Sequence, residues 1–268
     1  MPNFAGKAGA NEVQSVAAAF DIAERVHRFP NRLQMGRAAA QDAAATLIEM
    51  LERQPRVRMI FAAAPSQQTM LKALADMPGI AWERVEAFHM DEYWGLDPRD
   101  PAGFGNWLRR NLFDHLPFAE THVIPTQGAS DQISADYASL VSAHPIDIVC
   151  LGIGVNGHIA FNDPPVADFD DPLDVKLVTL DQVCRQQQVD DGCFPNLEAV
   201  PAEAITLTVP RLLRAERLFA VVPGRSKREA VRAALHGPVV TDCPASILRT
   251  HPGCQFYLDK ESDPDAED

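Results

Sequence analysis

Residues 146–163 read IDIVCLGIGVNGHIAFND, and this stretch decides the fold class. Residues 146–153 form a mainly apolar, β-branched run between Pro145 and Gly154, which predicts a strand buried on both faces. Glycines directly after such a strand permit a tight turn and a close approach of the backbone to a ligand. The sequence therefore predicts a buried strand that ends at a ligand-binding turn.

Further strands and helices alternate on both sides of this stretch. We predict strands at residues 57–64, 85–90, 175–180 and 218–222, and helices at residues 35–53, 66–74, 105–116, 134–142 and 226–235. This alternation indicates an α/β fold, with a Rossmann-like, mostly parallel sheet and helices on both faces. Ligands bind such sheets beyond the carboxyl ends of the strands.

The chain divides into three predicted parts. Residues 1–34 are interpreted as an N-terminal extension, residues 35–260 as a single α/β domain, and residues 261–268 as a frayed acidic tail. Hydrophobic residues make up 46% and charged residues 23% of the 268 positions, which is typical of a globular protein with one sizeable core.

Charge and composition narrow the partners and the location. The formal net charge of -13 argues against nucleic acid as a partner, because phosphate backbones attract basic surfaces. A small phosphorylated ligand is compatible with this negative net charge, because it needs only one local binding pocket. The chain has no apolar run of 18 residues and no basic leader at its start, so we expect neither a membrane span nor a secretory signal. Five cysteines without a CxxC pair predict reduced thiols and a cytoplasmic protein.

The histidine in the central stretch is a candidate general acid or base. His158 follows the glycines, and Asp163 lies five residues on, where it could orient the imidazole. A purely structural turn with a hydrogen-bonded histidine stays open. The spacing GIGVNG also fits a dinucleotide fingerprint, but it lies mid-chain and is followed by Pro164 and Pro165 instead of a helix, which argues against nicotinamide binding.

Two carboxylates end the predicted strand at residues 85–90. Asp91 and Glu92 are adjacent, so their side chains point to opposite sides and only one is expected to face a site. A carboxylate in a partly dry pocket has a raised pKa and can move a carbon-bound proton. The alternative is a helix N-cap or a surface pair.

A basic turn opens the last predicted helix. Residues 224–228 read GRSKR, and Lys227 with the helix N–H groups could hold a phosphate. A solvated basic helix start is the alternative. The sequence has no HxxxH or HxH spacing for a metal and no GxSxG elbow for a serine hydrolase, so we expect no catalytic metal.

Three strings occur in an order that resembles a known family. FHMDEYWGL, LGIGVNGHIAFNDP and VPGRSK, at residues 88–96, 151–164 and 222–227, are similar to the glucosamine-6-phosphate deaminase/isomerase family, which is related to the 6-phosphogluconolactonases. The resemblance extends from about residue 35 to residue 260. It implies conversion of an amino sugar 6-phosphate to a ketose phosphate and ammonia in amino sugar catabolism, without a cofactor. Assembly of this chain into a homo-oligomer is compatible with the resemblance.

The resemblance also implies roles for individual residues. Asp91 matches the aspartate that shuttles a proton between C2 and C1 of the open-chain sugar, and His158 matches the histidine that opens the ring. Asp163 matches a glutamate that partners this histidine, and Asn156 matches a position held by aspartate or asparagine. The positions implied to bind substrate or phosphate are Ala64, Pro65, Ser66, Gly157, Arg185 and Lys227.

Two departures from the family pattern affect the implied phosphate site. The family's Gly-rich loop is replaced by residues 64–67, APSQ, and Pro65 has no N–H to offer a phosphate. The family's phosphate-binding arginine aligns with Asp190. These changes keep a sugar-phosphate-binding sensor open as an alternative. A gluconolactonase-type hydrolase is a second alternative, but its relatives continue with GHTASLFP where this chain has IAFN at residues 159–162.

Overall fold

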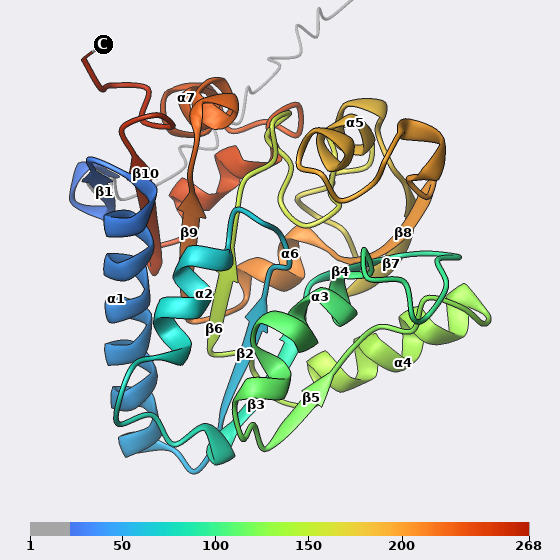
Figure 1. The fold of residues 1–268 in the computed structure, drawn as a ribbon, viewed down its shortest axis with the longest axis horizontal. Coiled ribbons are helices and arrows are strands. Elements are labelled where there is room, and N and C mark those ends of the chain that lie inside the picture. Colours follow the sequence, from blue (N-terminus) through green and yellow to red (C-terminus); the bar gives the residue numbers. More distant parts are fainter. Residues whose placement is uncertain (1–21, 268) are drawn as a thin grey trace, which may run out of the picture.

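A computed structural model describes residues 22–267 and contains a seven-stranded sheet (Figure 1). Its strands are β1 (Val26–Phe29), β2 (Val57–Phe61), β3 (Val85–His89), β5 (Glu120–His122), β6 (Ile148–Leu151), β9 (Arg217–Val222) and β10 (Cys254–Asp259). Their order is β1-β10-β9-β6-β2-β3-β5, and every neighbouring pair is parallel. The predicted α/β class with a mostly parallel sheet is confirmed.

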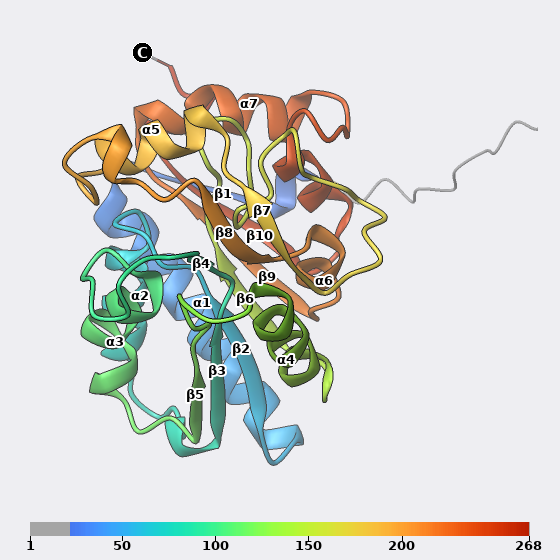
Figure 2. The same cartoon turned by 90° about the vertical axis from the view of Figure 1, so that its right-hand side faces the viewer.

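Helices cover both faces of this sheet (Figure 2). The helices α1 (Arg32–Arg53), α2 (Gln68–Ala75) and α3 (Phe104–Asn111) share one hydrophobic cluster with one face, and α4 (Ser130–Ser142), α6 (Val209–Leu213) and α7 (Arg228–His236) share a second cluster with the other face. Successive strand residues divide between the two: Met59 and Phe61 belong to the first cluster, and Ile60 belongs to the second. Burial on both faces explains why these strands are continuous apolar runs.

A small antiparallel sheet lies beyond the carboxyl end of β3. It has the order β4-β8-β7, formed by β4 (Asp91–Tyr93), β8 (Glu203–Leu207) and β7 (Val175–Thr179). The chain leaves the parallel sheet at Met90, whose carbonyl accepts a hydrogen bond from the Leu207 N–H at 2.8 Å. Asp91 then pairs with Thr206, so it lies at the junction of the two sheets.

The predicted elements are present with shifted ends. The predicted helix at residues 105–116 ends at Asn111 and continues as a short 3-10 turn, Phe113–His115. The predicted helix at residues 226–235 begins with a 3-10 turn, Arg225–Lys227, followed by α7. The strands and α-helices absent from the prediction are β1, β4, β5, β8, β10, α6 and α5 (Gln182–Asp190).

Both ends of the described chain pack against the domain. Part of the predicted N-terminal extension forms β1, which pairs with β10 at the edge of the main sheet, while residues 1–21 lie outside the described residues. Ser262 and Asp263 are buried, and Asp263 forms an ion pair with Arg28 at 3.1 Å, so the expectation that the acidic tail frays is wrong for these residues. Within residues 22–267, no helix is long and apolar enough to cross a membrane.

Candidate active site

A hollow opens at the carboxyl ends of β2, β3, β6 and β9. The chain runs from β2 through β3 to one edge and returns on the other side of β2 as β6, so the hollow lies at the switch point where ligands bind in open α/β sheets. Its walls are formed by Ala62, Ala63, Ala64, Ser66, Gln67, Met90, Asp91, Phe104, Gly152, Ile153, Gly154, His158, Ala160, Phe161, Gln187, Gln188, Asp191 and Lys227.

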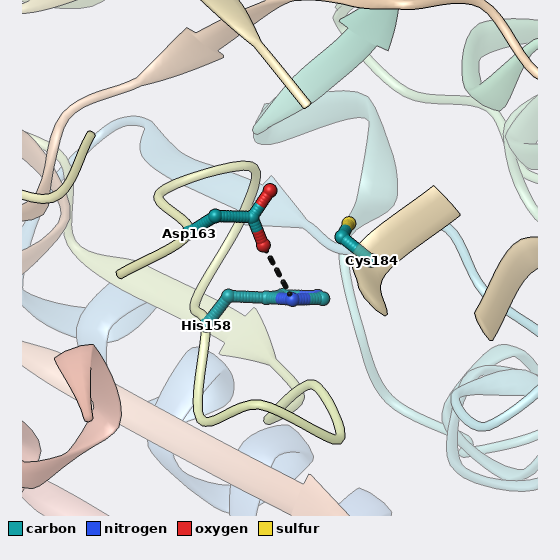
Figure 3. Close-up of side chains that lie close together, drawn as sticks. All are labelled: His158, Asp163 and Cys184. Atoms are coloured by element: carbon teal, nitrogen blue, oxygen red, sulfur yellow. Dashed lines mark ion pairs between the residues drawn. The ribbon is translucent and has the colours of Figure 1, made fainter. Parts of the chain in front are cut away.

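The turn after β6 places His158 in this hollow. The Gly157 N–H donates to the Gly154 carbonyl at 3.0 Å, and the Gly154 N–H donates to the His158 carbonyl at 2.9 Å, which closes the turn. His158 Nδ1 lies 3.0 Å from Asp163 Oδ1 (Figure 3) and 2.7 Å from Asn156 Oδ1. Both partners are acceptors, so Nδ1 carries a proton and the lone pair of the neutral ring lies on Nε2.

Asp163 is held by hydrogen bonds in a buried position beside His158. It accepts from Asn156 Nδ2 and from the Asp181 N–H, each at 3.0 Å. Burial alone would raise the pKa of this carboxyl, but the hydrogen bond and charge of His158, with the bonds from Asn156 and Asp181, bring the pKa below its usual value. Asp163 therefore stays ionised and can orient the imidazole.

Asp91 lies in the wall of the hollow at the first residue of β4. Only 5% of its surface is exposed, and its side chain makes no hydrogen bond with the rest of residues 22–267. Burial, with the nearby charges of Glu92 and Asp163, raises the pKa of Asp91 well above its ordinary value. Such a carboxyl binds a proton more readily than an exposed aspartate, so it can both take and return one.

Glu92 points away from the hollow and caps a helix. Its carboxylate accepts the N–H groups of Tyr93 and Phe104 at 2.9 Å and of Gly105 at 2.8 Å, at the beginning of α3. Asp91 and Glu92 thus divide as their alternation along the chain predicts: Asp91 faces the hollow, and Glu92 caps α3 from β4, although the N-cap residue of that helix is Gly103.

Lys227 brings the positive charge to the hollow. It is 5% exposed, and its ammonium group has neither a hydrogen bond nor an ion pair within the described part of the chain. Burial lowers the pKa of Lys227 to about 8, against an opposing effect of Asp191, which also lines the hollow. A buried ammonium without a partner is unfavourable unless a ligand supplies an anion.

The remaining predicted binding residues divide into two groups. Ala64 and Ser66 line the hollow, while Pro65 faces a neighbouring one. Gly157 packs against Cys243, and Arg185 donates to the carbonyls of Leu197 and Val200, each at 2.8 Å. The structure therefore does not place Gly157 or Arg185 in the wall of the hollow.

Glutamines that the sequence analysis did not select complete the wall. Gln187 accepts from the Val155 N–H at 2.9 Å and donates to Asp191 at 3.2 Å, so it joins the central turn to the end of α5. Gln188 accepts from the hydroxyl of Tyr93 at 2.8 Å. The sequence feature that could have indicated these glutamines is the polar run at residues 186–188, next to Arg185.

A cysteine lies beside the histidine and aspartate pair. Ligand atoms of His158, Asp163 and Cys184 lie within 4.8 Å of one another (Figure 3). Burial, together with the charge of Asp163, raises the pKa of the Cys184 thiol well above its ordinary value. A metal ligand must be a thiolate, and Asp163 already pairs with His158, so this donor set fits a metal poorly.

The comparisons with known proteins show the family of this chain. The family described as "Glucosamine-6-phosphate isomerases/6-phosphogluconolactonase" matches residues 30–256. The chain belongs to this family. The curated glucosamine-6-phosphate deaminase of Exiguobacterium sibiricum is 37% identical over 66% of this chain and 69% of its own length. That of Halalkalibacterium halodurans is 30% identical over 82% and 90%.

Solved structures of the family share the fold. A monomeric glucosamine-6-phosphate deaminase superposes with a TM-score of 0.81 at 26% identity, covering 89% of this chain and 98% of its own. A 6-phosphogluconolactonase from Thermotoga maritima superposes with a TM-score of 0.71 at 15% identity, covering 87% and 98%. The lactonase likeness is one of fold alone, so the lactonases are a related branch.

Proposed function

We propose that this chain is an amino sugar phosphate deaminase/isomerase that converts glucosamine 6-phosphate, or a close relative, to a ketose phosphate and ammonia. The convergence of three groups in one hollow carries the proposal: the unbonded carboxyl of Asp91, the imidazole of His158 and the unpaired ammonium of Lys227. A proton-transfer catalyst, a second acid-base group and an anion anchor are what this reaction requires.

Ring opening is the first step of the proposed reaction. His158, with its proton on Nδ1, presents Nε2 to the sugar, takes the proton of the C1 hydroxyl and delivers it to the ring oxygen, which yields the open-chain aldehyde. Asp163 and Asn156 position the ring and stabilise the imidazolium that forms transiently. Neither needs to contact the sugar.

Proton transfer between C2 and C1 is the second step. Asp91 removes the proton from C2 and returns it at C1, and a proton of the C2 ammonium passes to the C1 oxygen, which leaves a C1 hydroxyl and a C2 iminium group. Water adds to this carbon, and ammonia departs as the C2 ketone forms, so one water is consumed for each ammonia released. The raised pKa of Asp91 makes it a stronger base than an exposed aspartate, and its lack of hydrogen bonds leaves both oxygens available.

In the proposed complex, the substrate phosphate lies at the end of the substrate away from C1 and C2. Lys227 and the loop formed by Ala64, Pro65 and Ser66 hold it, and the binding energy places C1 and C2 beside Asp91 and His158. Free cysteines favour a cytoplasmic enzyme.

Ammonia release from glucosamine 6-phosphate tests the proposal. The wild-type chain should release ammonia and form a ketose phosphate, and deuterium from heavy water should enter at C1. Asp91→Asn should lower kcat by at least about 100-fold, because an amide cannot act as the base. Asp136→Asn, which alters an exposed carboxylate on α4, should change neither kcat for ammonia release nor the entry of deuterium at C1.

Two outcomes would point elsewhere. Binding of glucosamine 6-phosphate without turnover by the wild-type chain would favour a sugar-phosphate sensor. Hydrolysis of 6-phosphogluconolactone without ammonia release would favour the lactonase branch. Retention of more than about a tenth of wild-type turnover in Asp91→Asn would remove Asp91 as the base.

A further inference from the structure

A second hollow adjoins the candidate active site. It shares Ala63, Ala64, Phe104 and Asp191 with the first hollow, so these residues form a common wall. The far side of the second hollow is formed by α3 and the loop before it, including Trp107 and Arg110. The two hollows therefore adjoin along this common wall.

Two segments that depart from the family pattern meet at this common wall. Ala64 faces both hollows, and Pro65, which lacks an N–H, faces the second one. Asp190, the position that aligns with the phosphate-binding arginine, is exposed and lines neither hollow, while its neighbour Asp191 faces both. Neither the loop at residues 64–66 nor the end of α5 therefore brings a cation to this wall.

The first hollow alone holds too little positive charge for a phosphate. Lys227 is the one lysine or arginine in its wall, and Asp191 lies close enough to affect the pKa of Lys227. A sugar phosphate carries a charge between -1.5 and -2 at neutral pH. One ammonium beside a carboxylate leaves most of this charge uncompensated, so a second cation would strengthen binding.

Arg110 is the cation of the second hollow. It lies in the last turn of α3, and its Nη2 donates to the Pro101 carbonyl at 2.5 Å, which holds the guanidinium beside the hollow. Its other N–H groups make no hydrogen bond or ion pair within residues 22–267. Asp100 also lines this hollow, but its Oδ1 accepts the Ala102 N–H at 2.8 Å in its own turn.

We propose that Arg110 is a phosphate-binding residue, which grips the substrate phosphate from α3 in place of the arginine that is missing from α5. The phosphate would lie across the loop at residues 64–66, between Lys227 and Arg110, and the guanidinium would offer the paired N–H groups that suit phosphate oxygens. The identity of the bound ligand rests on the proposed function.

Titrations of glucosamine 6-phosphate, inorganic phosphate and glucosamine against the wild type and three variants test this role. Arg110→Ala should weaken both phosphate compounds by roughly 10- to 100-fold and raise KM for glucosamine 6-phosphate more than it lowers kcat. Weak binding of glucosamine should be unaffected. Arg110→Lys should recover part of the loss, because it restores the charge without the paired donors.

Arg109→Ala is the matched control. Arg109 is the preceding residue of the same helix, and it forms an ion pair with Asp114 at 3.8 Å instead of lining either hollow. Its replacement should leave all three affinities unchanged. The Arg110 side chain is exposed, so both variants should melt near the wild-type temperature.

The outcomes separate this inference from the proposed function. Equal affinities for Arg110→Ala and Arg109→Ala would overturn the role of Arg110 while leaving the deaminase proposal intact. If the wild-type chain turned over no amino sugar phosphate, the proposed function would fail, and a loss of inorganic phosphate binding in Arg110→Ala alone would still support the phosphate-binding role. A wild-type chain that bound no phosphate compound would overturn both.

Discussion

The imidazole of His158 occupies the space that a side chain at Gly154 would need. A Cβ at residue 154 would lie 2.2 Å from His158 Cε1 and 2.3 Å from each ring nitrogen. The Gly154 N–H also donates to the His158 carbonyl at 2.9 Å. This glycine is therefore required by the close approach of the ring.

Replacing Gly154 by alanine should displace the imidazole from the hollow. We expect kcat for ammonia release to fall by at least about 100-fold, the usual contribution of a general acid-base group, while the free energy of unfolding falls by roughly 1–3 kcal/mol, as for other overpacked positions. Kinetic assays and urea titrations measure the two effects. Gly95→Ala is the control, because Gly95 has a φ of +83° but no atom within 4 Å of its added Cβ, and it lines neither hollow. Wild-type kcat in Gly154→Ala would mean that the ring position does not matter.

The carboxyl of Glu92 should make folding stability depend on pH. Burial raises its pKa from 4.5 to about 7, although the N–H groups of Gly105, Phe104 and Tyr93 oppose this shift. The folded state then binds more protons than the unfolded state between these two values, so stability falls as the pH rises from about 4.5 to about 7. The whole effect is on the order of 3 kcal/mol.

Glu92→Gln removes this titration. The variant should be less stable than the wild type by roughly 1–3 kcal/mol at high pH, because a single amide oxygen cannot accept all three N–H groups. Its stability deficit should be larger at pH 5 than at pH 8, since only the wild type loses stability over that range. Urea titrations at pH 5, 6, 7 and 8 measure the deficit. A constant deficit at all four pH values would contradict the assigned pKa.

The sequence predicted the central strands because their burial on both faces leaves continuous apolar runs. It did not predict the break at Met90, because no glycine or proline marks it; the break arises when Asp91 pairs with Thr206 of β8, more than a hundred residues away. Nor did it predict α5, whose residues are mostly polar although Gln187 and Gln188 are buried over the hollow. Such burial depends on tertiary contacts that no local pattern records.

The site was predictable where its residues directly follow strands. Asp91 and His158 follow parallel strands whose carboxyl ends meet at one edge, so their convergence follows from the fold class. Asp191 and Arg185 show the limit of this reasoning. Cys184, Gln187, Gln188 and Asp191 have the spacing of one helix face, and residue 185 lies about 100° from residue 184 around the helix. The arginine therefore faces the carbonyls of neighbouring turns instead of the hollow.

Lys227 should make phosphate affinity depend on pH. Its pKa of about 8, lowered by burial, means that the ammonium is lost as the pH rises through 8. Affinity for glucosamine 6-phosphate should therefore fall between pH 7 and pH 9, by at most about tenfold per pH unit. Lys227→Ala should weaken this ligand by roughly 10- to 100-fold at pH 7 and remove the slope, while glucosamine binds as before. Lys72→Ala, which alters an exposed lysine on α2, is the control. An equal loss for glucosamine would mean that Lys227 supports the fold instead of the phosphate.

Asp191 opposes phosphate binding through its charge. It lines the hollow with Lys227 and the second hollow with Arg110, so a bound phosphate between these two cations would also lie near this carboxylate. Asparagine has nearly the same shape and can keep the hydrogen bond from Gln187 through its carbonyl oxygen. Asp191→Asn should therefore remove repulsion without rearranging the wall.

We expect Asp191→Asn to bind glucosamine 6-phosphate and inorganic phosphate about 3- to 10-fold more tightly at pH 7 and low salt. The gain should shrink in 0.5 M salt, because Asp191 is exposed and its field is screened. It should also shrink above pH 8, because the negative charge of Asp191 raises the pKa of Lys227 and its removal makes the ammonium easier to lose. Asp190→Asn is the control: Asp190 accepts from Gln186 on the exposed side of α5 and lines neither hollow. Weaker phosphate binding in Asp191→Asn would show that the carboxylate supports the ligand, either by holding Lys227 protonated or by accepting a hydroxyl of the sugar, and comparison of the losses for inorganic phosphate and glucosamine would distinguish these two roles.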